Sequence, residues 1–168
     1  DIDLDALEHN YRAIRTHIPD DCFFLGVMKA DAYGHGAVPI AKAFSRKADY
    51  FGVAEMNEAL ELRRAGVETP ILILGYTSPN LFETALANDI TLTMFQYEAI
   101  KTLSETAVRM CKTARVHFGV DTGMSRIGFR VTDEEVEKIL ITAENFRDGL
   151  QQNWFDKDVM AEVFERYG

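Results

Sequence analysis

Short apolar runs alternate with amphipathic segments along almost the whole of this 168-residue chain. Apolar runs that predict strands cover residues 22–28, 50–54, 70–75, 90–95 and 114–120. Amphipathic stretches that predict helices cover residues 4–17, 38–44, 55–65, 81–87, 97–110 and 132–143. Strands that alternate with helices over short connections pair in parallel, so the pattern predicts an α/β fold. Periodicity alone leaves an open doubly wound sheet and a closed eightfold barrel as alternatives.

The first apolar run, residues 22–28 (C-F-F-L-G-V-M), is almost wholly apolar. A run of this kind predicts a strand that is buried on both faces of a sheet. No repeat, low-complexity tract or linker interrupts the alternation that follows. We therefore expect residues 1–168 to belong to a single α/β domain.

The composition narrows the possible partners and the cellular compartment. Eighteen basic and 27 acidic residues give a net charge of −9, which argues against nucleic acid or an anionic membrane as the main partner. No apolar stretch approaches the roughly 20 residues that a membrane span needs. The acidic, amphipathic start of the chain is unlike a secretory signal. Two cysteines do not make a disulfide framework, so we expect a cytoplasmic protein.

A lysine closes the first predicted strand, in the segment V-M-K-A-D-A-Y-G-H-G of residues 27–36. The carboxyl ends of parallel strands form the active face of α/β folds. Partial burial there favours the neutral amine of Lys29, which is the form that attacks a carbonyl carbon. The alternative is a surface lysine whose charged end reaches the solvent.

A lone arginine follows the fifth predicted strand, in the segment V-D-T-G-M-S-R-I-G-F of residues 120–129. Its planar guanidinium suits a carboxylate or phenolate, because it donates two parallel hydrogen bonds. The alternative is a surface arginine that pairs with Asp121 or Glu134.

Other charged residues predict no site of their own. Glu55, Glu58 and Glu61 are interpreted as exposed charges on one helix. The sequence has no paired His or Cys at metal-ligand spacing, no phosphate loop of the nucleotide type and no G-x-S-x-G, so it supports neither a metal nor a serine nucleophile.

Taken together, the two segments resemble motifs of the alanine racemases. V-M-K-A-D-A-Y-G-H-G-A-V resembles their cofactor-lysine signature, and V-D-T-G-M-S-R-I-G-F resembles their arginine-bearing loop. The resemblance runs colinearly from residue 1 to about residue 148. It implies a (β/α)8 TIM barrel, of which this chain carries the first part. It also implies a pyridoxal 5'-phosphate-dependent isomerase that interconverts L- and D-alanine by a two-base mechanism and supplies D-alanine for peptidoglycan.

The resemblance implies roles for five residues. Lys29 matches the lysine that bonds the cofactor and acts as one of the two catalytic bases, and Tyr33 matches a tyrosine at the cofactor phosphate. Leu74 matches an apolar residue that lines the cofactor. Arg126 matches the arginine near the cofactor's phenolic oxygen and the substrate carboxylate. Met124 matches a residue whose backbone meets that carboxylate across a homodimer.

Three departures from the family pattern shape the expectations. Many members carry a carbamylated lysine two residues before D-T-G-M, where this chain has Gly119, so Arg126 is held there by another anion, such as chloride, or is held more loosely. The C-terminal β domain, with the tyrosine that serves as second base, is absent. Residues 151–168 resemble a helix that follows an omitted or deleted strand. We therefore expect an incomplete chain that is inactive alone.

Two related functions remain as alternatives. One is a non-catalytic barrel of the pyridoxal-phosphate homeostasis type, although those proteins lack a D-T-G-M-x-R-x-G-F loop. The other is a serine racemase or related amino-acid racemase. A structural domain with decayed motifs is disfavoured because both motifs are intact.

Overall fold

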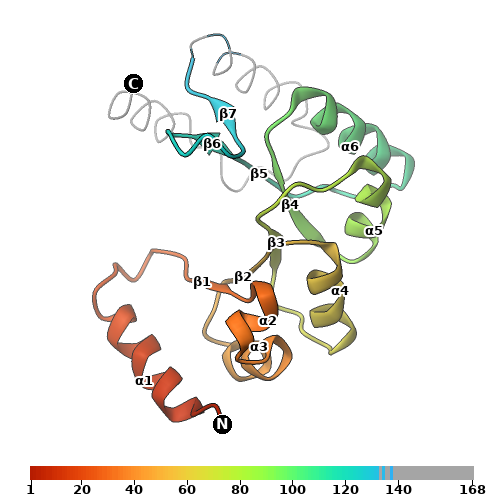
Figure 1. Ribbon diagram of the computed structural model, residues 1–168. Coiled ribbons are helices and arrows are strands. Elements are labelled where there is room, and N and C mark those ends of the chain that lie inside the picture. Colours follow the sequence, from red (N-terminus) through yellow and green to blue (C-terminus); the bar gives the residue numbers. More distant parts are fainter. Residues whose placement is uncertain (133, 135–136, 138–168) are drawn as a thin grey trace. The chain divides into compact units, whose positions relative to one another are not determined.

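The computed structural model describes residues 1–132, 134 and 137, which form two compact units (Figure 1). The first unit covers residues 1–75, and the second begins at Tyr76. Each unit combines parallel strands with helices.

The first unit is a three-stranded parallel sheet with helices in the connections. Its elements are α1 (Leu4–Arg15), β1 (Leu25–Val27), α2 (Lys29–Gly34), α3 (Ala37–Phe44), β2 (Tyr50–Val53), α4 (Met56–Arg64) and β3 (Ile71–Ile73). The central strand β2 pairs with β1 on one side and with β3 on the other. Phe51, Val53, Ile71 and Ile73 are fully buried, and Ala59 of α4 is as inaccessible as they are. The apolar runs around residues 50 and 70 thus become core strands, as predicted.

The prediction that the first strand is buried on both faces is wrong. Leu25 and Gly26 of β1 are only half-buried, and the side chain of Val27 is 38% exposed. The strand is also shorter than the predicted 22–28, since Phe23 lies outside it with 57% of its surface exposed. The reason is position, because β1 is an edge strand and pairs only with β2 among the described residues.

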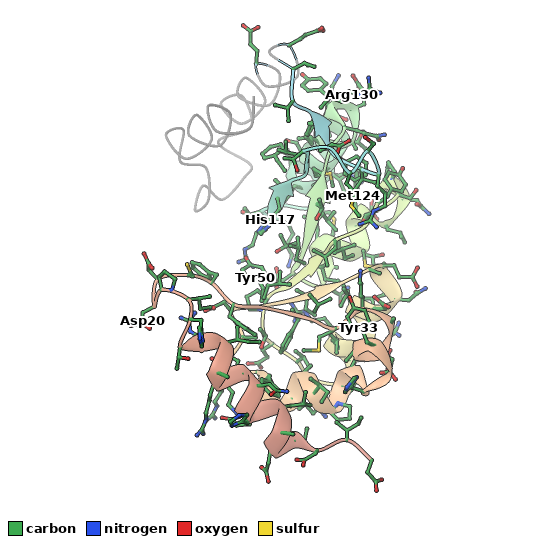
Figure 2. All side chains as sticks on the ribbon, turned by 60° about the vertical axis from the view of Figure 1, so that its left-hand side comes forward. Asp20, Tyr33, Tyr50, His117, Met124 and Arg130 are labelled. Carbon is green, nitrogen blue, oxygen red and sulfur yellow. The ribbon has the colours of Figure 1, made fainter. Side chains whose placement is uncertain are left out.

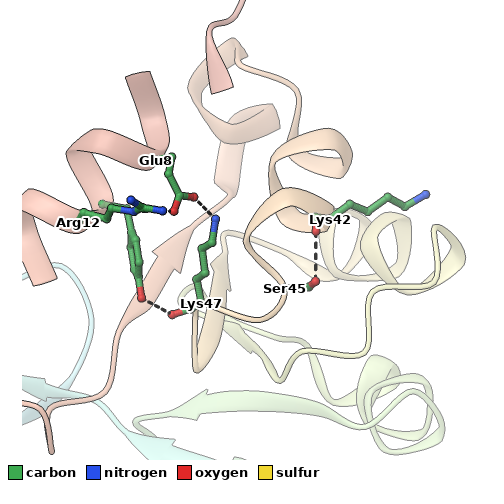
Figure 3. A network of polar contacts seen from close by, with 6 residues as sticks. Glu8, Arg12, Lys42, Ser45 and Lys47 are labelled. Atoms are coloured by element: carbon green, nitrogen blue, oxygen red, sulfur yellow. Dashed lines mark hydrogen bonds and ion pairs between the residues drawn. The ribbon is translucent and has the colours of Figure 1, made fainter. Parts of the chain in front are cut away.

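Aromatic and polar contacts attach helix α1 to the rest of the first unit, and the polar contacts with Lys47 are drawn in Figure 3. The ring of Tyr11 meets Phe24 edge to face, with 5.0 Å between centroids. Its hydroxyl donates a 3.0 Å hydrogen bond to the carbonyl of Lys47, whose ammonium pairs with Glu8. Asp3 begins the helix by accepting from the amides of Asp5 and Ala6, as an N-cap residue does.

The second unit repeats the same strand and helix alternation. It contains the 3-10 helix η1 (Pro79–Leu81) and then α5 (Phe82–Ala87), β4 (Ile90–Met94), α6 (Tyr97–Arg109), β5 (Val116–Phe118), β6 (Val120–Asp121) and β7 (Phe129–Arg130). Strand β4 pairs with β5 in parallel, and β6 pairs with β7. The core consists of the buried side chains Phe82, Leu92, Ile100 and Leu103.

The alternation predicted from the sequence is confirmed for five strands and the helices between them. The predicted strand 114–120 is divided, because β5 ends at Phe118 and Val120 pairs with Phe129 instead. The predicted helices at 132–143 and 151–168 lie almost entirely outside the described residues. Within the described part of the chain, no helix combines the length and the apolar character that crossing a bilayer requires.

Candidate active site

The segment after Lys29 forms a left-handed turn. Four consecutive residues, Ala30 to Tyr33, have φ between 51° and 54° and ψ between 39° and 48°. For residues other than glycine this conformation costs about 1–2 kcal/mol each. The turn is closed by the amide of Ala32, which donates to the carbonyl of Met28 at 2.9 Å, and by that of Gly36, which donates to Asp31 at 2.9 Å. A run of this kind requires support from its surroundings.

The left-handed turn brings Lys29 and Tyr33 together. The ammonium nitrogen of Lys29 lies 5.8 Å from the centroid of the Tyr33 ring. Lys29 is half-buried, whereas the Tyr33 side chain is 62% exposed at the surface of the first unit (Figure 2). An amine and a phenol are therefore neighbours directly after the carboxyl end of β1.

Two side chains of the same segment fasten the turn locally. The carboxylate of Asp31 accepts a 2.6 Å hydrogen bond from the amide of Ala37, the first residue of α3. The ring nitrogen Nδ1 of His35 lies 2.9 Å from the carbonyl oxygen of Ala32. These contacts give Asp31 and His35 a structural role in the loop.

Glu58 fastens the turn from another helix, and its interpretation as an exposed charge is wrong. Its Oε1 accepts from the amide of Ala30 at 2.7 Å, and its Oε2 accepts from the amide of Ala54 at 2.6 Å. One carboxylate therefore joins the segments that follow β1 and β2. The sequence offers a partial signal for the contact with Ala54, because Glu58 is the third residue of α4, a position from which a glutamate reaches back toward the start of the helix. The contact with Ala30 has no such local signal.

Leu74 lies at the same edge of the first unit's sheet as Lys29, because both residues follow the carboxyl ends of parallel strands. The amide of Leu74 donates to the carbonyl of Val53 at 2.8 Å and so extends the ladder by one bond. A Cβ added to Gly52 would lie 2.7 Å from Leu25 Cδ2 and 3.1 Å from Leu74 Cδ1. The glycine thus leaves room for two leucine side chains, which form an apolar wall.

Met124 and Arg126 lie in the second unit, in the loop between β6 and β7. Asp121 holds this loop, since its Oδ1 accepts from the amides of Ser125 at 2.8 Å and Gly123 at 3.0 Å. These hydrogen bonds, first of all the one from Ser125, lower the pKa of the Asp121 carboxyl. Met124 is 75% exposed (Figure 2), and Arg126 is exposed as well. The ion pairs among the described residues do not include Arg126, and its role stays a prediction.

Glycines close this loop. Gly128 has φ +132°, and a Cβ on it would lie 2.4 Å from the amide nitrogen of Asp121. At Gly119 a Cβ would lie 3.1 Å from Thr93 Cγ2, which is tight but possible. The first unit thus groups Lys29, Tyr33 and Leu74, and the second unit groups Met124 and Arg126.

Comparison with known proteins identifies the family that shares this arrangement. The family described as "Alanine racemase, N-terminal domain" matches residues 2–152. This chain belongs to the alanine racemase family. Alanine racemase 2 of Oceanobacillus iheyensis is 44% identical over 138 residues, which cover 82% of this chain and 35% of that relative.

Solved structures of racemases also resemble the chain. The alanine racemase of Clostridium difficile 630 in complex with cycloserine has a TM-score of 0.82 and 42% identity, over 84% of this chain and 39% of that one. The histidine racemase of Leuconostoc mesenteroides has a TM-score of 0.75 and 33% identity, over 84% of this chain and 38% of that one. The predicted fold, an α/β chain with the first part of a TIM-type barrel, is confirmed. The chain spans less than half the length of these relatives.

Proposed function

We propose that this chain is the cofactor-bearing part of a pyridoxal 5'-phosphate-dependent alanine racemase, which supplies D-alanine for peptidoglycan. The observation that carries the proposal is the Lys29 amine beside the Tyr33 ring, presented by a left-handed turn at a strand end. Membership of the alanine racemase family supports the assignment of the amino acid.

The residues of the first unit fit this cofactor. A half-buried amine is available for its carbonyl group, an exposed phenol hydroxyl can donate to its phosphate, and the Leu25–Leu74 wall offers its ring an apolar contact. Pyridoxal phosphate, when bound, supplies an electron sink that acidifies the α-hydrogen of an amino acid. We assign Lys29, Tyr33 and Leu74 to these three contacts.

In this proposal Lys29, Arg126 and Met124 have different roles in racemisation. Lys29 anchors the cofactor and carries the α-proton on one face of the substrate. Arg126 donates to the cofactor's phenolic oxygen and to the substrate carboxylate, because a planar guanidinium suits both. The backbone at Met124 meets the same carboxylate.

Inversion of a stereocentre also requires a second base on the opposite face of the substrate. Tyr33 is assigned to the phosphate, and His35 is engaged with Ala32 in the same loop as Lys29. We therefore assign the second base to a tyrosine of a C-terminal domain contributed by the partner in a homodimer. The 168-residue chain alone is then expected to show no racemisation above background. Its two exposed free cysteines suit a reducing compartment, and we propose the cytoplasm.

The test is a substrate comparison on the full-length protein supplied with pyridoxal phosphate. We expect kcat/KM to be higher for alanine than for serine or histidine. Each amino acid is tested as a substrate in both the L-to-D and the D-to-L direction. Cofactor binding without racemisation of any amino acid would instead indicate a cofactor-carrying barrel, an alternative that the D-T-G-M-S-R-I-G-F loop of residues 121–129 argues against.

A second candidate function is the racemisation of a larger amino acid. The likeness to the histidine racemase favours it, because that enzyme shares the fold at 33% identity. A kcat/KM for histidine or serine that exceeds the value for alanine would establish this candidate.

A further inference from the structure

Glu58 connects the turn that presents Lys29 to the helix that follows β2. Its two carboxylate oxygens are both used, one by the amide of Ala30 at 2.7 Å and the other by that of Ala54 at 2.6 Å. Ala30 follows Lys29 directly and is the first residue of the left-handed turn. The contact therefore acts on the peptide next to the reactive lysine.

Hydrogen bonds from backbone amides to a charged carboxylate are stronger than those between neutral groups. Glu58 is half-buried, so its two bonds are partly shielded from water. Helix α4 is itself fixed to the sheet, because Met56, Ala59 and Leu62 are buried beneath it. The carboxylate thus ties a strained segment to one of the best-packed helices of the first unit.

We infer that Glu58 is a positioning residue for Lys29, and this inference rests on the proposed racemase function. By holding the Ala30 amide, Glu58 keeps Ala30 to Tyr33 in the left-handed conformation in which the lysine amine lies beside the tyrosine ring. Without it the turn has a lower-energy alternative, since right-handed backbone is favoured at Ala30 and Ala32. Lys29 would then present its amine in a different direction.

A purely structural role at the start of α4 is the competing explanation. That role needs only the bond from the amide of Ala54, the residue before the N-cap Glu55. In that case the contact with Ala30 is dispensable, and a substitution of Glu58 lowers the melting temperature without altering catalysis. The two explanations therefore differ in kinetics.

The experiment compares Glu58→Gln with wild type in the full-length holoenzyme. Glutamine keeps the size of the side chain but has one acceptor oxygen in place of two. Its NH2 group would face the N–H of either Ala30 or Ala54, and two donors cannot form a hydrogen bond. We expect kcat for alanine to fall on the order of tenfold or more, because small misplacements of a reacting group are costly. KM is expected to stay within about twofold, since the assigned carboxylate contacts of Arg126 and Met124 are untouched.

The matched control is Glu61→Gln, which removes the same charge from an exposed position of the same helix. It should leave kcat, KM and the melting temperature at wild-type values. Borohydride fixation of the cofactor, followed by peptide mapping, should still locate it on Lys29 in both variants. A kcat loss in Glu58→Gln with the cofactor still on Lys29 supports positioning.

Wild-type kcat in Glu58→Gln, with or without a lower melting temperature, would overturn the inference. If this variant does not fold, Glu58→Asp keeps the charge and both oxygens one methylene further from the amides, and the same kinetic criterion applies. Failure of the racemase proposal is recognised separately, because wild type would then lack racemisation and would carry no cofactor on Lys29.

Discussion

The two loops that carry the candidate site residues are held in different ways. The turn after Lys29 is fastened from another helix by Glu58 of α4 and, within its own segment, by Asp31, whose carboxylate accepts from the amide of Ala37. The loop of Met124 and Arg126 is fastened by its own first residue, since Asp121 accepts from two amides within four residues. The difference indicates that a run of four left-handed residues needs support from other elements, whereas a loop with one such residue, Ser125 at φ 58°, is ordered by a local turn.

The largest expected effect tests whether the externally fastened turn exists to present a reactive amine. Lys29→Ala should lower racemisation of alanine by at least roughly a thousandfold, because it removes both an anchor and a catalytic base. The measurement is kcat for alanine in the full-length holoenzyme. Lys42→Ala, on the exposed side of α3, is the control and should retain wild-type activity. If Lys29→Ala racemised alanine as fast as wild type, the turn would not serve to present a catalytic amine.

The next effect tests the bond by which the segment fastens its own turn. Asp31→Ala deletes the acceptor for the Ala37 amide and places alanine where aspartate tolerates a positive φ better. The free energy of unfolding should fall by about 1–2 kcal/mol. Asp31→Asn keeps both an acceptor oxygen and that tolerance, so it should lose less than half as much. Urea denaturation of the three proteins measures the difference, and equal losses would show that the charge of the carboxylate, and not its acceptor oxygen, decides the stability.

A third, smaller effect concerns pH and the second unit. Burial lowers the pKa of His117 in β5 below its usual value of 6.5. The unfolded chain therefore takes up a proton near pH 6.5 that the folded unit does not, and stability falls as the pH drops through that value. In His117→Gln the melting temperature should depend less on pH in this range than it does in wild type. The control His9→Gln, in exposed α1, should keep the wild-type dependence. Identical profiles for His117→Gln and wild type would contradict the prediction.

The smallest effect tests the locally fastened loop. The pKa of Asp121 is lowered, so its stabilising contribution is present above the unfolded value of 3.8 and is lost as the pH falls through the lower folded value. Asp121→Asn keeps an acceptor oxygen but not the charge, so it should be somewhat less stable than wild type at neutral pH. Below pH 4 its melting temperature should fall less steeply than that of wild type. An equally steep fall in both proteins would contradict the prediction.

Sequence patterns predicted most of the fold because the periodicity of apolar residues is a local property of the sequence. The apolar runs at β2, β3 and β4 became core strands, and the amphipathic segments became helices. The misjudged strand was β1, since an apolar run does not reveal whether a strand lies at the edge of a sheet. The motif also placed Lys29 correctly at the end of a strand.

The geometry of the candidate site could not be predicted from the sequence, for two reasons. Nothing in the propensities of Ala30, Asp31, Ala32 and Tyr33 predicts a left-handed run, which exists only because the surroundings impose it. The role of Glu58 depends on an amide 28 positions away, a tertiary contact that periodicity cannot detect. The rule that charged helix residues are exposed predicted the wrong environment for Glu58.

The central claim is that Lys29 bonds pyridoxal phosphate, and it can be measured directly. The full-length protein is incubated with the cofactor, treated with borohydride, digested and mapped by mass spectrometry. We predict that the fixed cofactor lies on the peptide containing Lys29 and that the absorbance band of the bound cofactor vanishes on reduction. The fixed cofactor on any other lysine, with Lys29 unmodified, would contradict the account.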